Sequence, residues 1–175
     1  MSRHDKVEFG FIRLVHEELY GLFVNPYGRL NAAGLKSGQK VLEVGCGPGF
    51  FTVPAARVVE DEGFVYALDL NPFAVEYVLR KIQRLGLKNV EVKCADAVKT
   101  SMQDQSIEVA FLFSVIHVFP DVTKVMKEMH RVLKANGVIS IVSRWPEKKL
   151  LDTVTANGLF HFVEKTDRVS KFNKV

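Results

Sequence analysis

The sequence is poor in cysteine, tryptophan and proline, and it has no long apolar run. Two cysteines cannot build a disulfide framework or a conventional zinc site, so we expect neither disulfides nor a metal. The longest strongly apolar run, Val109 to Ile116, is interrupted by Ser114, whereas a membrane span needs about 20 such residues. The start, Met1 to Lys6, has no apolar segment behind it that would make a secretory signal. These absences predict a soluble, cytoplasmic protein without a membrane partner.

The composition is that of an ordinary globular protein. Hydrophobic residues make up 47% of the 175 residues and charged residues 25%, which excludes a disordered chain. The net charge of +4 is too small to be an electrostatic signature of nucleic acid binding. The length predicts a single domain over residues 1–175.

Strand-like and helix-like segments alternate along most of the chain. Short runs rich in Val, Ile and Phe are typical of strands buried on both faces. They lie at residues 40–45, 64–69, 90–94, 107–113 and 138–143. Apolar spacing predicts helices from Pro72 to about Gly86, after Asp121 until Asn136-Gly137, and at about 148–157. Met126 and Met129 lie on an apolar stripe and are expected in the core. This alternation predicts parallel strands joined by helical crossovers.

The C-terminal end adds a different connection. Two further strand-like runs, 159–164 and 168–173, have only three residues between them. A parallel crossover needs a dozen residues or more, so these two strands are expected to be antiparallel. The sequence therefore predicts a Rossmann-like, doubly wound α/β fold. Its sheet would be mixed and seven-stranded, with six parallel strands and a reversed last strand.

A glycine-rich turn follows the first strand. Gly45, Gly47 and Gly49 occupy alternate positions, which lets the backbone turn sharply and approach a ligand closely. Asp69 ends the second strand, 20 residues after Gly49, where a carboxylate can accept hydrogen bonds from both hydroxyls of a ribose. A dinucleotide fingerprint would need a third glycine where Phe50 stands. The pattern therefore favours a nucleoside ligand other than NAD or NADP.

Five motifs in order resemble those of the class I S-adenosylmethionine-dependent methyltransferases, in the small-molecule group often called type 11. The resemblance runs from about Lys40 to the C-terminus. The motifs are Glu43-Val44-Gly45-Cys46-Gly47-Pro48-Gly49, Ala67-Leu68-Asp69-Leu70-Asn71-Pro72, Ala95-Asp96-Ala97, residues 113–121 and residues 131–137. The resemblance implies S-adenosylmethionine as cofactor and methyl transfer to an unidentified, small-molecule acceptor.

The resemblance also implies roles for residues of the turn. Gly45, Cys46, Gly47 and Gly49 would line the methionine part of the cofactor, and Glu43 would help to hold its ammonium group. Cys46 equally suits a small filler of the turn. It is not expected to pair with Cys94, because strands one and three would lie about 10 Å apart.

Further roles are implied at the ends of the next strands. Asp69 would hold the ribose, Leu70 would pack on the adenine, and Asp96 with Ala97 would recognise the adenine edge. Ser114 would lie near the sulfonium and carboxylate end. Simpler interpretations stand beside these: a helix cap for Asp69, a turn for Asp96 and ordinary packing for Leu70.

His117 is the best candidate for a general base, because it follows the fourth strand, near the expected position of the methyl group. An imidazole can accept a proton at neutral pH. A histidine that only packs at the substrate mouth is the competing interpretation. The fourth motif lacks the Asn- or Asp-Pro-Pro-Tyr sequence of many amino-methylating enzymes, which disfavours adenine, cytosine or glutamine as acceptor.

Residues 39–175 are expected to form the cofactor-binding core, and residues 1–38 a partly helical cover. The apolar spacing of residues 11–22 supports a helix there, and residues 25–28 are interpreted as a turn. Tyr20 and Tyr27 would belong to a lid or only anchor the cover. So small a cover implies a small acceptor, a larger one that completes the pocket, or a homodimer.

The sequence leaves three alternatives to an enzyme that acts on a small molecule. RNA or protein as acceptor is suggested by Lys165, Arg168, Lys171 and Lys174, which also suit a solvated strand edge. A catalytically inactive, cofactor-binding partner subunit is the second. A nicotinamide-dependent reductase, the third, is disfavoured by Phe50 and by the reversed strand.

Overall fold

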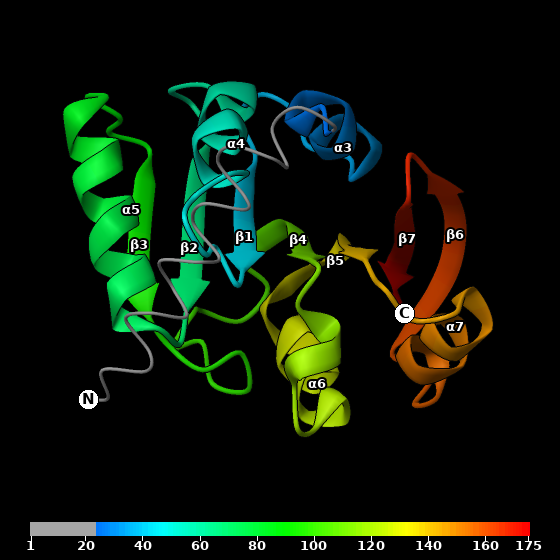
Figure 1. Ribbon diagram of the computed structural model, residues 1–175. Helices are drawn as coiled ribbons and strands as arrows, with labels where there is room; N and C mark the ends of the chain where they lie inside the picture. The colour runs from blue at the N-terminus through cyan, green and yellow to red at the C-terminus, as the bar shows by residue number, and fades with distance from the viewer. Residues whose placement is uncertain (1–23) are drawn as a thin grey trace.

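The computed structural model describes residues 24–175, which form a seven-stranded mixed sheet between two layers of helices. The strands are β1 (Lys40–Val44), β2 (Phe64–Asp69), β3 (Val90–Cys94), β4 (Ile107–Phe113), β5 (Leu133–Val142), β6 (Phe160–Thr166) and β7 (Val169–Lys174). Their order is β3-β2-β1-β4-β5-β7-β6, and β7 is antiparallel to both neighbours (Figure 1). The predicted fold class, with its reversed last strand, is confirmed.

Each face of the sheet has its own apolar core. The helices are α3 (Pro26–Ala32), α4 (Thr52–Val59), α5 (Pro72–Arg84), α6 (Val122–Val132) and α7 (Glu147–Thr155), with a 3₁₀ turn η2 at Ile116–Val118. Alternate residues of β1 point to opposite faces, so Val41 packs with α3, α4 and α5, and Leu42 with α6 and α7. Met126 and Met129 are fully buried in the second core, as expected. None of the helices in residues 24–175 is long and apolar enough to cross a membrane.

Two helices begin with the same Asn-Pro signal. Asn71 accepts a hydrogen bond from the Phe73 backbone at 2.9 Å, and Pro72 occupies the first turn of α5, as the sequence predicts. Asn25 likewise accepts from the backbone of Tyr27 at 3.1 Å. The interpretation of residues 25–28 as a turn is therefore wrong: they begin α3. Pro at the first helical position does not break a helix. Proline lacks a backbone N–H, and an N–H at this position would have no intrahelical partner.

The α6–β5 connection is shorter than expected. The helix ends at Val132, and β5 pairs with β4 from Leu133 instead of from Val138. The expected turn is an irregularity within β5. Ile107 of β4 pairs with Leu133 and Val109 pairs with Val138, so β5 advances by five residues where β4 advances by two. A Cβ on Gly137 would lie 2.8 Å from the Lys134 carbonyl oxygen, so this close approach requires glycine.

The basic residues near the end of the chain do not line a sheet edge as a group. The edge strand is β6, whereas Lys171 and Lys174 belong to β7, an inner strand. Lys174 Nζ donates to the Leu133 carbonyl oxygen at 2.8 Å, and Lys171 pairs with Glu164. The solvated-edge interpretation is wrong for these two lysines, because the final hairpin inserts β7 between β5 and β6.

The N-terminal cover lies partly outside the described residues. The expected helix over residues 11–22 and Tyr20 belong to that part. Tyr27 accepts a hydrogen bond from Arg57 of α4 at 3.3 Å, so within the described chain it anchors α3 to α4. The division into a cover at 1–38 and a core at 39–175 stays a prediction.

Candidate cofactor and acceptor site

The glycine-rich turn after β1 is tied to the end of β2 by backbone hydrogen bonds. Gly45 N and Cys46 N both donate to the Leu68 carbonyl oxygen, at 2.8 and 2.9 Å. Asp69 then accepts from two sides, from Gly47 N at Oδ2 and from Asn71 N at Oδ1, each at 2.8 Å. The carboxylate therefore fixes the turn and the start of α5 relative to each other.

Glycine is needed at the three positions of this turn for different structural reasons. A Cβ on Gly45 would lie 2.4 Å from a methyl of Val115, so this glycine permits a close approach to the segment after β4. Gly49 approaches Val78 of α5 in the same way, at 3.1 Å, and does not line a cavity. Gly47, with φ +50°, has open space where its Cβ would be and lines a cavity. Of the three, Gly47 leaves the most room for a ligand.

Two cavities meet at Asp69, beyond the carboxyl ends of the strands. The larger has about 290 Å³ and the smaller about 140 Å³, and both are also lined by Val44, Gly45, Val115 and Val118. They lie where the strand order reverses between β1 and β4, which is where open α/β sheets bind ligands. Their combined size is in the range of small-molecule sites.

Glu43 is a buried carboxyl at the floor of the larger cavity. It is 3% exposed, and the Thr52 hydroxyl of α4 donates to Glu43 Oε2 at 2.5 Å. Burial raises the pKa of Glu43 to about 8, and nearby Asp69 adds to this rise, while the Thr52 hydrogen bond and Lys81 oppose it. Burial therefore favours the protonated form of Glu43 near neutral pH in the ligand-free protein.

Most of the other residues predicted for the adenosyl end line the smaller cavity. Leu70 and Ala97 line it with Asp69, whose pKa is raised by burial despite three backbone hydrogen bonds. Asp96 does not line it: the side chain is exposed and accepts from the Val98 backbone at 3.0 Å, as in a turn. The structure therefore brings Asp69, Leu70 and Ala97 together and leaves Asp96 at the rim.

Three predicted residues line the larger cavity toward β4. Cys46 is buried there, and its burial raises the pKa of the thiol, which makes it a poor nucleophile. Ser114 has a φ of +61°, a conformation that costs a non-glycine residue about 1–3 kcal/mol and that often marks functional sites. His117 of η2 also lines the cavity, and its buried Nδ1 has no hydrogen-bond partner among residues 24–175.

The sequence did not reveal the aromatic wall or the arginine of this cavity. Phe50, Phe51, Phe111 and Phe113 form its apolar side. Arg144, two residues after β5, borders it as well. The position of Arg144 just beyond the carboxyl end of a predicted strand could have indicated that it borders the site. The phenylalanines carried no signal that distinguishes them from core residues.

The fold and the site geometry define a class I methyltransferase. The model of the family described as "Methyltransferase domain" matches residues 35–171, so the chain belongs to that family and the predicted resemblance is confirmed. Its cofactor is S-adenosylmethionine. The described residues hold no group of three or more His, Cys, Asp or Glu side chains suited to a metal ion.

Individual relatives give the degree of likeness. A demethylmenaquinone methyltransferase of Geobacillus stearothermophilus is 33% identical over 104 residues, which are 59% of this chain and 44% of that one. The chain thus spans less than half the length of this curated relative. A SAM-dependent methyltransferase of Aquifex aeolicus superposes with a TM-score of 0.82 at 24% identity, covering 95% of this chain and 96% of that one. The YcgJ protein of Bacillus subtilis gives 0.64 at 26% identity, covering 73% and 54%.

The residues present fit S-adenosylmethionine. The cofactor has a ribose with two hydroxyl donors. This suits a half-buried Asp69, because a carboxylate has acceptor capacity beyond the hydrogen bonds that it accepts from Gly47 N and Asn71 N. It also carries an ammonium group, which suits a buried carboxyl such as Glu43. The open space at Gly47 leaves the turn accessible between them.

The raised pKa of Glu43 makes the stability of the ligand-free protein depend on pH. The folded state binds the Glu43 proton more tightly than the unfolded chain, so this contribution is complete below about pH 4.5 and is lost as the pH rises toward 8. Between these values the free energy of unfolding should fall relative to Glu43→Gln by up to about 1.4 kcal/mol per pH unit. Urea unfolding of both proteins at pH 5, 6, 7 and 8 measures this.

Thr52→Val is the matched control, because it removes the hydrogen bond but keeps the ionisable carboxyl. It should retain the pH slope that Glu43→Gln loses. A constant difference between wild type and Glu43→Gln over this range would show that Glu43 ionises normally.

Proposed function

We propose that the protein transfers the methyl group of S-adenosylmethionine to a small-molecule acceptor. The observation that carries this proposal is the Asp69 carboxylate, held between two cavities by the backbone of Gly47 and Asn71. A family match supports methyl transfer as the reaction. The modest volume of the cavities supports a small acceptor.

The cofactor would extend along the ends of β1 and β2. Asp69 would accept hydrogen bonds from the ribose, and Glu43 would face the ammonium group and ionise on binding. The adenine would occupy the smaller cavity against Leu70 and Ala97, with Asp96 reaching its amino group from the rim. Gly47 would let the methionine part pass close to the backbone, beside Ser114 at the junction with the acceptor.

The bound cofactor supplies a methyl group already activated by its sulfonium. An acceptor nucleophile that carries a proton would have to give it up to a side chain of the site or to solvent as the methyl group is transferred. The protein's task is therefore to orient the acceptor in line with the methyl. The phenylalanine wall of the larger cavity keeps water from competing, and His117 would take the proton.

The proposed acceptor is a small organic molecule. The relative from Geobacillus stearothermophilus is a demethylmenaquinone methyltransferase, which supports a small organic acceptor for this chain as well. RNA or protein as acceptor, an inactive cofactor-binding subunit and a homodimer stay alternatives from the sequence. The cytoplasmic location likewise stays a prediction.

Replacement of Asp69 should abolish most of the cofactor affinity. Asp69→Ala removes the acceptor of the ribose hydroxyls, and two charge-assisted hydrogen bonds are worth at least tenfold to a hundredfold in affinity. Isothermal titration of wild type and variant with S-adenosylmethionine, S-adenosylhomocysteine, NADH and NADPH measures this. We expect micromolar binding of the two adenosyl compounds to wild type and no saturable binding of either nicotinamide.

Asp152→Ala, which removes an exposed carboxylate of α7 that lines neither cavity, is the control and should bind like wild type. A circular dichroism melt of Asp69→Ala separates lost contacts from a disordered turn, since Gly47 and Asn71 lose their acceptor as well. Saturable NADH or NADPH binding without an adenosyl response would contradict the proposed function.

His117→Asn should lower kcat without changing the affinity for S-adenosylhomocysteine. General-base catalysis contributes about 10²–10⁴-fold, and His117 lines the cavity that would hold the acceptor. Once screening for S-adenosylhomocysteine release has identified an acceptor, kcat against pH for both proteins measures the effect. Unchanged turnover would rule out the base and leave His117 a packing role.

A further inference from the structure

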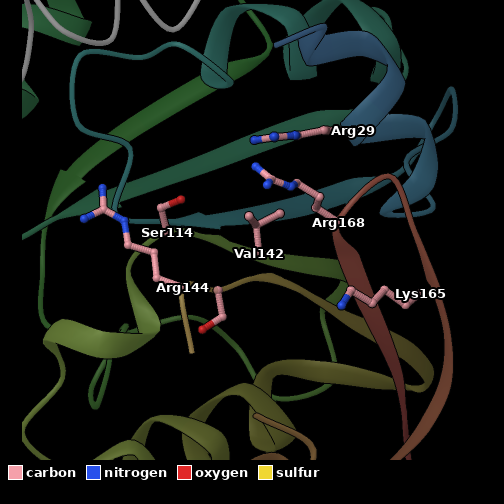
Figure 2. A pocket seen from close by; sticks show the side chains of 7 residues that line it. Arg29, Ser114, Val142, Arg144, Lys165 and Arg168 are labelled. Atoms are coloured by element: carbon pink, nitrogen blue, oxygen red, sulfur yellow. The ribbon is translucent and has the colours of Figure 1, made fainter. Parts of the chain in front are cut away.

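A second basin opens beside the larger cofactor cavity, and its wall is strongly basic. It has about 410 Å³ and shares Ser114 and Arg144 with the cofactor cavity. Its other charged side chains are Arg29, Lys165 and Arg168, shown projecting around it in Figure 2. Among residues 24–175, four cationic side chains and no carboxylate line it. Such a surface attracts anions.

The basic side chains come from segments far apart in the sequence. Arg29 belongs to α3 and is only 5% exposed, and α3 is held against the sheet where the Ser140 hydroxyl donates to the Ala33 carbonyl oxygen at 2.9 Å. Lys165 and Arg168 come from the β6–β7 hairpin, which lies next to α3 (Figure 1). Lys165 also pairs with Glu147 at 2.6 Å on the surface. The tertiary fold thus gathers these charges.

Arg168 occupies a backbone position that favours glycine. Asp167 and Arg168, with φ of +47° and +66°, are the two central residues between the paired Thr166 and Val169. This is the geometry of a type I′ hairpin turn, where Asp-Gly or Asn-Gly is preferred. An arginine there strains the backbone, and strain of this kind concentrates at functional sites. Its side chain reaches the basic basin.

We propose that this basin binds an anionic group of the methyl acceptor, a phosphate or a carboxylate. The inference rests on the proposed methyl transfer, and it names the chemical class of the substrate. An anion held by Arg29, Lys165 and Arg168 would direct the rest of the acceptor past Ser114 and Arg144 toward the larger cavity. Arginine forks suit phosphate and carboxylate oxygens equally.

The neighbouring lysines favour a small anion over a nucleic acid. A phosphodiester chain needs a basic track along a surface. Lys171 and Lys174, the residues that would continue the track, are engaged with Glu164 and with the Leu133 carbonyl oxygen. Arg29, Arg144, Lys165 and Arg168 instead surround a single pocket.

The test uses the whole protein saturated with S-adenosylhomocysteine and titrated with inorganic phosphate, pyrophosphate, acetate and benzoate in a chloride buffer. We expect saturable binding of the phosphates, the carboxylates or both, and the stronger series identifies the acceptor's anion. Arg168→Gly should weaken this binding at least about tenfold, because it removes a charged hydrogen-bonding fork. Lys165→Gln should weaken it by a smaller factor, and its surface ion pair matters little for folding.

Arg168→Gly is a favourable variant because glycine suits the turn. Its melting temperature should equal that of wild type or exceed it by about 2–4 °C, so weakened binding cannot come from unfolding. Arg84→Ala, which removes the same charge from the end of α5 beside β3, is the control and should bind anions as wild type does.

The outcomes separate the two proposals. Intact binding of S-adenosylhomocysteine with no saturable anion binding, or with equal anion binding by Arg168→Gly, would overturn the anionic acceptor alone. Absent S-adenosylhomocysteine binding would overturn the methyltransferase proposal and the acceptor with it. Tight, steeply salt-dependent binding of a single-stranded RNA without saturable binding of free anions would assign the basin to nucleic acid.

Discussion

The geometry of the site depends on the hydrogen bonds that the Asp69 carboxylate accepts from the backbone. Its oxygens accept hydrogen bonds from the backbone N–H of Gly47 in the turn after β1 and of Asn71 at the start of α5. These bonds hold an otherwise adaptable glycine turn in one conformation at the end of the sheet. Because backbone donors occupy only part of the carboxylate's capacity, the same group that builds the turn can also receive a ligand.

Acidic and basic side chains lie on different sides of the site at the carboxyl ends of the strands. Glu43 and Asp69 lie on the side of β1 and β2, where a cofactor with an ammonium and a sulfonium would bind. The arginines and Lys165 line the adjoining basin, between α3 and the final hairpin. Arg144 and Ser114 border both spaces. Opposite charges on the two sides would place cationic cofactor and anionic acceptor with their reacting ends at this border.

The sequence predicted those features of the fold that depend on local patterns of residues. Alternating apolar runs predicted the sheet, and a three-residue connection predicted the reversed strand. The spacing of the glycines and Asp69 pointed to the strand ends where the two cavities lie. These features could be predicted because backbone turns and strand ends follow local chemistry. The sequence could not predict Arg29 or Arg168 as lining residues, since they meet only through tertiary packing. It misassigned residues 25–28 as a turn, because Asn-Pro begins helices as well as turns. Gly49 makes room for Val78 of α5, and its predicted contact with the cofactor stays a prediction.

A crystal structure of the protein with S-adenosylhomocysteine tests the cofactor site most directly. The geometry predicts the ribose hydroxyls at about 2.7 Å from the Asp69 carboxylate, the adenine in the smaller cavity beside Leu70, and the sulfur facing Ser114. A ligand bound elsewhere, or a ribose that does not contact Asp69, would contradict it.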